Sequence, residues 1–194
     1  MDKIELGASD NNEVTKEIVP SIKGTIRDAL PYILFTLLLV ILLKYVIIHS
    51  IVPSCSMENT IKTGNHLIGV RSKLAFKNNM PKKGDIVIFK YPDDNTQLYV
   101  KRIIGVPGDI IDIKVNGIYI NGEKLDEEYL KETMVTKEEL CIEVPKDKYF
   151  MMGDNRNNSL DSRFWHNPFV SKDEIIARVW LTFSIKKPNA KIIW

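Results

Sequence analysis

The sequence predicts a mainly β protein, with an antiparallel β-sheet domain tethered by one N-terminal transmembrane α-helix. A nearly continuous apolar run, ALPYILFTLLLVILLKYVIIHSIV, occupies residues 29–52. About 20 such residues are enough to cross the hydrocarbon core of a bilayer. From residue 66 onward, short runs rich in β-branched and aromatic residues recur between Gly and Pro turn signals, a pattern typical of strands joined by turns.

The apolar run divides the 194 residues into three parts: a polar tail at 1–28, a transmembrane helix at 29–52 and a β-rich domain at 53–194. Lys23 and Arg27 precede the run closely, whereas no Lys or Arg follows it until Lys62. This excess of positive charge predicts a cytoplasmic tail and an extracytoplasmic domain, hence a single-pass protein of the plasma membrane. Lys44 lies past the middle of the run, where its ammonium can snorkel to the nearer interface.

Seven strands are expected in the outer domain, at residues 66–70, 85–91, 98–106, 110–115, 118–121, 148–152 and 175–184. Asn116-Gly117 predicts a two-residue hairpin turn between the fourth and fifth of these. The charged segment 123–140 is expected to hold a short helix and a surface loop. Residues 171–174, Ser-Lys-Asp-Glu, are expected to start a brief helical turn.

Composition and spacing argue against several classes of function. A formal net charge of +2 is too small to indicate nucleic acid as a partner. Cys55 and Cys141 have no metal-like spacing, and the three histidines are scattered along the chain. We therefore expect neither a metal site nor a Ser-His-Asp triad, and no cofactor.

Residues 153–163 are rich in Asp and Asn, as a calcium-binding loop would be. The calcium loop pattern fails here because the cation Arg156 stands two places after Asp154, and no glycine occupies the required position. We expect instead a buried polar network of bidentate carboxylate–guanidinium contacts. Its members would be Asp154, Arg156, Asp161 and Arg163.

Lys101 lies in the expected strand at 98–106, with Tyr99 and Ile103 as neighbours on its own face. Partial burial lowers the pKa of a lysine toward neutrality, and a neutral lysine is a competent general base. The alternative is a lysine at a strand edge whose ammonium stays in water.

Three blocks, in this order, resemble bacterial type I signal peptidases of the shorter, Gram-positive type. They are Ser54-Cys55-Ser56-Met57 just after the apolar run, Lys101-Arg102 in a strand, and Gly-Asp-Asn-Arg…Ser-Leu-Asp-Ser-Arg at 153–163. The resemblance covers about residues 50–184. It implies a membrane-bound serine endopeptidase with a Ser-Lys dyad, which removes signal peptides from exported preproteins by cleaving after small-x-small sequences.

The resemblance also implies a role for individual residues. It assigns Ser56 as nucleophile, Lys101 as general base, Ser54 as an oxyanion donor, Ser159 as a serine that orients the lysine, and Asp161 with Arg163 as a structural ion pair. The sequence departs from the family pattern at three positions. Cys55 stands where glycine is more usual, Asn59 where proline is more usual, and Asn157 where aspartate is often found. None of these changes removes a required functional group.

The expected chemistry needs the neutral amine of Lys101 to take the proton of Ser56, with the Ser56 backbone N–H and the Ser54 hydroxyl donating to the oxyanion. Apolar residues near the dyad are expected to line shallow pockets for small side chains: Val52, Met57, Ile61 and Val100. The expected partners are signal peptides and the lipid bilayer, with the protein acting as a monomer.

Two other functions remain open at the level of sequence. One is a membrane-tethered or lipidated, non-catalytic binding domain, because residues 52–55 loosely mimic a lipid-modified cysteine site. The other is a self-cleaving Ser-Lys regulator of the repressor type, although residues 1–28 are too short for a DNA-binding domain. The binding domain leaves Ser56, Lys101 and Ser159 without a shared role. The regulator shares the Ser-Lys chemistry, but the apolar run argues against a soluble protein.

Overall fold

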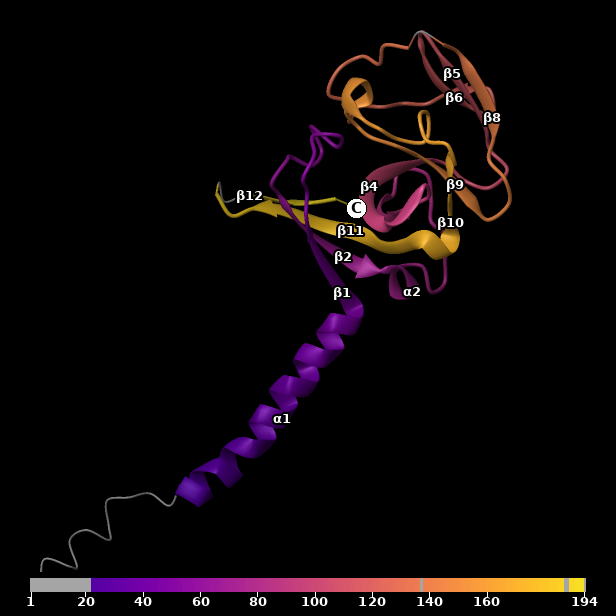
Figure 1. Ribbon diagram of the computed structural model, residues 1–194. Coiled ribbons are helices and arrows are strands. Elements are labelled where there is room, and N and C mark those ends of the chain that lie inside the picture. Colours follow the sequence, from indigo (N-terminus) through magenta and orange to yellow (C-terminus); the bar gives the residue numbers. More distant parts are fainter. Residues whose placement is uncertain (1–21, 137, 187–188, 194) are drawn as a thin grey trace, which may run out of the picture. The chain divides into compact units, whose positions relative to one another are not determined.

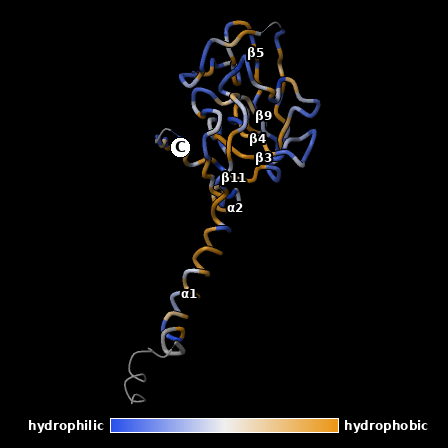
Figure 2. The backbone as a smooth tube through the Cα atoms, turned by 60° about the vertical axis from the view of Figure 1, so that its left-hand side comes forward, coloured by the Kyte–Doolittle hydropathy of each residue, from blue (hydrophilic) through white to orange (hydrophobic). Residues whose placement is uncertain are grey.

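Helix α1 (Ile22–Val46) is apolar on all sides over residues 29–43, and Figure 2 shows its part nearer β1 as mostly hydrophobic. In the computed structural model, which describes residues 22–136, 138–186 and 189–193, it is the one helix long and apolar enough to cross a membrane, over Ile26–Val46. The hydroxyl of Thr36 donates to the carbonyl of Tyr32 at 2.8 Å, which satisfies a polar group inside the apolar helix. Residues 1–21 of the expected tail lie outside the described part of the chain.

The helix ends earlier than the sequence suggests. Residues 29–46 of the expected transmembrane segment are helical, whereas Ile47–Ile51 form strand β1 (Figure 1). Strand β1 pairs antiparallel with β2 (His66–Arg71), from Ile47 opposite Val70 to Ile51 opposite His66. The β-branched residues of this segment suit a strand, and pairing with β2 supplies hydrogen bonds that a continued helix would forgo.

The chain divides into two units between Lys44 and Tyr45, the first of which contains most of α1. The second is built on an eight-stranded antiparallel sheet in the order β1-β2-β11-β3-β4-β9-β10, with β12 added to β11. Its remaining strands are β3 (Ile86–Tyr91), β4 (Asp94–Gly105), β9 (Lys148–Met152), β10 (Phe169–Ser171), β11 (Ile175–Ser184) and β12 (Asn189–Ile192). A short helix, α2 (Ser72–Ala75), follows β2. The expected mainly antiparallel β fold with one N-terminal apolar helix is therefore confirmed.

A second, four-stranded antiparallel sheet lies at one end of this domain (Figure 1), in the order β7-β6-β5-β8. It consists of β5 (Ile110–Lys114), β6 (Gly117–Ile120), β7 (Glu123–Lys124) and β8 (Leu140–Glu143). The turn from β5 to β6 is Val115-Asn116, one residue earlier than expected, because Lys114 pairs with Gly117. In this register Ile113 lies opposite Ile118, and both side chains enter the core.

The segment at 123–140 was expected to hold a short helix, and its described residues form none. Strand β7 opens it, and an irregular loop leads to β8. Leu125 and Met134 pack on the core of the second sheet, and this packing holds the segment between them in an irregular conformation. The expected helical turn after Ser171 is confirmed as the 3-10 helix η2 (Lys172–Glu174), with a capping box between Ser171 and Glu174. A second 3-10 helix, η1, spans Arg156–Asn158.

Ile118 is fully buried in the core cluster between the second sheet and β9, whereas Val115 on the adjacent turn is 67% exposed. We expect Ile118→Ala to lower the free energy of unfolding by about 2–5 kcal/mol, since it leaves a cavity in a packed core. Val115→Ala, which removes the same kind of atoms from the surface, should change it by no more than about 0.5 kcal/mol. Denaturant unfolding in detergent micelles measures both, and equal losses would contradict this assignment of the core.

Candidate active site

Ser56 lies on the loop between β1 and β2, which is closed at its base by two backbone hydrogen bonds. The N–H of Val52 donates to the carbonyl of Asn65 at 3.0 Å, and the N–H of Gly64 donates to the carbonyl of Val52 at 2.8 Å. Directly after Ser56, the side chains of Met57 and Ile61 are buried in the core between β2, β3 and β11. These anchors hold Ser56 in a fixed, 6% exposed position.

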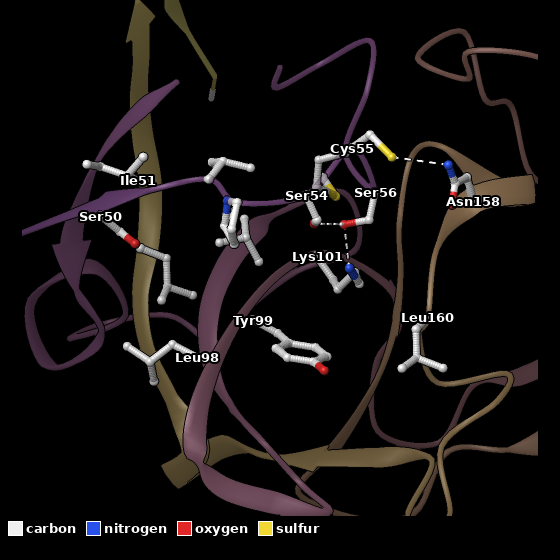
Figure 3. Close-up of a pocket in the computed structure, with 15 residues that line it drawn as sticks. Ser50, Ile51, Ser54, Cys55, Ser56, Leu98, Tyr99, Lys101, Asn158 and Leu160 are labelled. Carbon is white, nitrogen blue, oxygen red and sulfur yellow. Dashed lines mark hydrogen bonds between the residues drawn. The ribbon is translucent and has the colours of Figure 1, made fainter. Parts of the chain in front are cut away.

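Lys101 comes from β4, in the middle of the main sheet, and its Nζ lies 2.6 Å from the Oγ of Ser56 (Figure 3). The lysine is only 4% exposed. Burial lowers its pKa from 10.5 to about 8, against the attraction of the carboxylates of Asp161 and Asp154, which favours the charged form. The pair can therefore act as nucleophile and base at mildly alkaline pH.

Ser54 lies beside the pair, with its Oγ 3.3 Å from the Oγ of Ser56 (Figure 3). Within the described residues, the backbone N–H of Ser56 donates no hydrogen bond. A hydroxyl and an amide thus stand near the Ser56 oxygen, and both are able to donate to a developing negative charge.

Ser159 is also buried, and its hydroxyl has no hydrogen-bond partner among the described residues. It is pressed against Gly153, where a Cβ would lie 2.3 Å from the Oγ of Ser159 and 2.4 Å from the carbonyl oxygen of Ser56. Only a glycine at 153 lets Ser159 and the nucleophile segment approach each other this closely. No hydrogen bond joins Ser159 to Lys101 in this structure.

The four residues of the expected polar network are all paired, but Asp154 and Arg156 pair with residues outside the network. Asp161 and Arg163 do pair, through two hydrogen bonds of 2.8 and 2.9 Å. Asp154 instead takes the fork of Arg102, at 2.8 and 2.6 Å, because the register of β4 on β9 sets Arg102 opposite Met152, two residues before Asp154.

Arg156 pairs with Glu127, from the loop after β7, and not with an aspartate of its own block. The guanidinium of Arg102 lies over the ring of Tyr129, 3.9 Å from the ring centroid. The guanidinium of Arg156 lies near the same ring. Sequence reasoning missed Arg102, Glu127 and Tyr129 as site residues. Arg102 carried a signal, as the neighbour of Lys101 on the opposite strand face, whereas the loop residues carried none.

The dyad opens into a cavity of about 390 Å³ (Figure 3). Of the four residues expected to line a substrate pocket, Val52, Met57 and Val100 do so. Ile61 does not line it, because its side chain is fully buried in the core beneath the loop. Sequence reasoning missed further lining residues, among them Ile88, Leu98, Tyr99 and Leu160.

The unusual Cys55 has a defined environment. The side-chain amide of Asn158 donates to its sulfur at 3.1 Å (Figure 3). Both Cys55 and Cys141 are free thiols. Among the residues that the structure describes, no group of three or more His, Cys, Asp or Glu side chains is placed to hold a metal ion.

The close contact at Gly153 yields a test of the site geometry. We expect Gly153→Ala to displace the carbonyl of Ser56 or the hydroxyl of Ser159, since the new methyl group would overlap both. A misplacement of about 1 Å at a reacting group can cost roughly 100-fold in rate. Cleavage assays and the melting temperature should show an activity loss of that order with the fold retained, and full activity would refute the contact.

Comparison with known proteins gives a consistent result. A family model described as signal peptidase, peptidase S26, matches residues 26–184. Signal peptidase I P of Bacillus subtilis subsp. natto is 39% identical over 161 residues, which are 78% of this chain and 85% of the relative. A probable signal peptidase I-2 of Synechocystis sp. is 36% identical over 137 residues, which are 68% of this chain and only 61% of that relative.

A crystal structure of a signal peptidase I from Enterococcus faecalis V583 covers 52% of this chain and 97% of its own, with 28% identity and a TM-score of 0.45. The family match spans most of the chain, from within α1 through both sheets to the end of β11. With the Bacillus relative covered over most of its length, the chain belongs to the signal peptidase family, peptidase S26.

Proposed function

We propose that this protein is a signal peptidase I: a membrane-bound serine endopeptidase that removes signal peptides from exported preproteins with a Ser56–Lys101 dyad. The observation that carries the proposal is the 2.6 Å contact between the Lys101 amine and the Ser56 hydroxyl in a buried site that opens into a cavity. The reaction is inferred from membership of the family, and the residues that carry it out are inferred from the contact.

In the first step the Oγ of Ser56 attacks the carbonyl carbon of the scissile peptide bond while the neutral amine of Lys101 takes its proton. The carbonyl oxygen becomes an oxyanion, to which the Ser56 N–H and the Ser54 hydroxyl donate. Losing one such donor typically costs about 2.7–4 kcal/mol of transition-state stabilisation. The Lys101 ammonium then gives its proton to the departing amine, which leaves an ester between Ser56 and the signal peptide.

In the second step a water molecule attacks the ester, with Lys101 again as the base. We assign to Ser159 the task of accepting a hydrogen bond from the Lys101 ammonium, a partner that its buried hydroxyl lacks in the resting state. The ion pair of Asp154 with Arg102 holds the start of the segment at 153–163 against β4. The carboxylate of Asp161 accepts a hydrogen bond from the N–H of Gly153, the residue against which the Ser159 hydroxyl is packed.

The proposed substrate, a small-x-small sequence, carries small side chains before the cleaved bond. The cavity beside Ser56 is lined in part by apolar groups, including Val52, Ile88 and Val100. Burying a small apolar side chain there is favourable, at about 25 cal/mol per Å² of apolar surface.

We further propose a polar tail at 1–28 in the cytoplasm, one membrane span within 29–52, and a peptidase domain at 53–194 outside the plasma membrane. The positive charge before the span supports this orientation. The membrane boundary would fall near Val46, where the helix gives way to β1. A monomer is enough for activity, because every group in the mechanism comes from one chain.

A membrane-tethered or lipidated binding domain explains less. It gives the buried contact between Lys101 and Ser56 no role. Lipid modification at Cys55 would also require cleavage just before that residue, which would sever β1 from the sheet in which it pairs with β2.

We expect Ser56→Ala and Lys101→Ala each to abolish cleavage of a preprotein, since one removes the nucleophile and the other its base. Both variants should still insert in membranes. The assay incubates detergent-solubilised protein with a preprotein and compares each variant with the wild type. Near-normal processing by either purified variant would refute the dyad.

The pH profile should identify the base. The pKa of Lys101 is lowered to about 8, so its neutral form is scarce below that pH and predominates above it. We expect kcat/KM to rise with pH along a limb centred near 8 and then to level off. A limb centred on the ordinary histidine pKa, about 6.5, would point to a different base.

A further inference from the structure

Asn155, in the loop after β9, makes hydrogen bonds to two consecutive carbonyls of the nucleophile segment. Its side-chain Nδ2 donates to the carbonyl of Cys55 at 3.1 Å, and its backbone N–H donates to the carbonyl of Ser56 at 3.0 Å. The residue is 2% exposed.

The bond to Cys55 bears on the oxyanion site through the geometry of the peptide group. In a trans peptide the C=O and the following N–H point in opposite directions. The carbonyl of Cys55 and the N–H of Ser56 belong to one peptide group. When Asn155 holds that carbonyl on its own side, it turns the Ser56 N–H to the opposite side.

A second donor reaches the same carbonyl, since the N–H of Glu58 lies 3.1 Å from it. That bond lies within the turn and would move with it. Asn155 instead follows β9, which pairs with β4, the strand that carries Lys101. Its side chain therefore fixes the peptide group relative to the base and not only relative to the turn.

We propose that Asn155 is a positioning residue for the oxyanion site: its side-chain amide aims the Ser56 N–H at the place where the negative charge develops. The inference rests on the proposed peptidase function. It requires a side chain that donates, so an ionised aspartate, which has nearly the same shape and only accepts, cannot replace it.

The test compares Asn155→Ala and Asn155→Asp with Asn157→Ala. Asn157 is an exposed control in the same block, because its side chain also bonds the backbone of a distant segment. Its Nδ2 donates to the carbonyl of Thr133, and its Oδ1 accepts from the N–H of Val135. The backbone bond from residue 155 to Ser56 persists in all three variants. Any difference therefore reports on the Asn155 side chain.

We expect both Asn155 variants to lose roughly 10- to 100-fold in kcat, with KM nearly unchanged, whereas Asn157→Ala keeps kcat within about twofold. A peptide aldehyde gives the specific readout. The Ser56 oxygen adds to its carbonyl carbon, the Ser56 proton passes to Lys101, and the aldehyde oxygen becomes an oxyanion. In the Asn155 variants the affinity for the peptide aldehyde should fall by the same factor as kcat/KM.

Unchanged kcat in both Asn155 variants would overturn the inference. A fall in kcat with unchanged aldehyde affinity would also overturn it, by showing a general structural role. Melting temperatures show whether each variant folds, and aldehyde affinity is measured on the folded protein. If the wild type fails to cleave, or Ser56→Ala still cleaves, the proposed function falls instead.

Discussion

The site depends on keeping one lysine out of water. An exposed lysine is charged at neutral pH and cannot accept a proton, so Lys101 must be buried to act as a base. Burial would be futile if nearby carboxylates held it in the charged form. Asp161, the strongest such influence, is paired with Arg163, whose own charge pushes the pKa of Lys101 back down. The Asp161–Arg163 ion pair thus has an electrostatic role as well as a structural one.

The order of strands explains how distant residues meet. Strand β4 lies between β3 and β9, so Lys101 is central in the sheet. Its partner β9 ends at Met152 and leads directly into the loop that contains Gly153, Asn155 and Ser159. The loop after β1 closes over the same place, with its apolar residues in the core below. One antiparallel pairing therefore brings two of the three sequence blocks together, and the third packs on them.

The main strands and the contact between Ser56 and Lys101 could be predicted because they have local signals: alternating apolar residues, and short blocks in a fixed order. Partners within the polar network could not. Asp154 pairs with Arg102 because of strand register, and Arg156 with Glu127 because of a loop path. The end of the helix at Val46 was missed because Ile47 and Ile48 are as apolar as the helix itself. Ile61 was misplaced because apolar character alone does not separate a pocket wall from a core.

Two buried polar atoms without partners lie in one short loop, the Oγ of Ser159 and the Oδ1 of Asn155. Such an atom typically costs about 1–3 kcal/mol for as long as it has no partner. In the proposed mechanism the Lys101 ammonium has three N–H donors, more than the single contact with Ser56 in the resting site uses. The proposed hydrogen bond to the Ser159 hydroxyl would then form only when the positive charge appears. An arrangement of this kind favours the charged intermediate over the resting enzyme, which is the condition for catalysis.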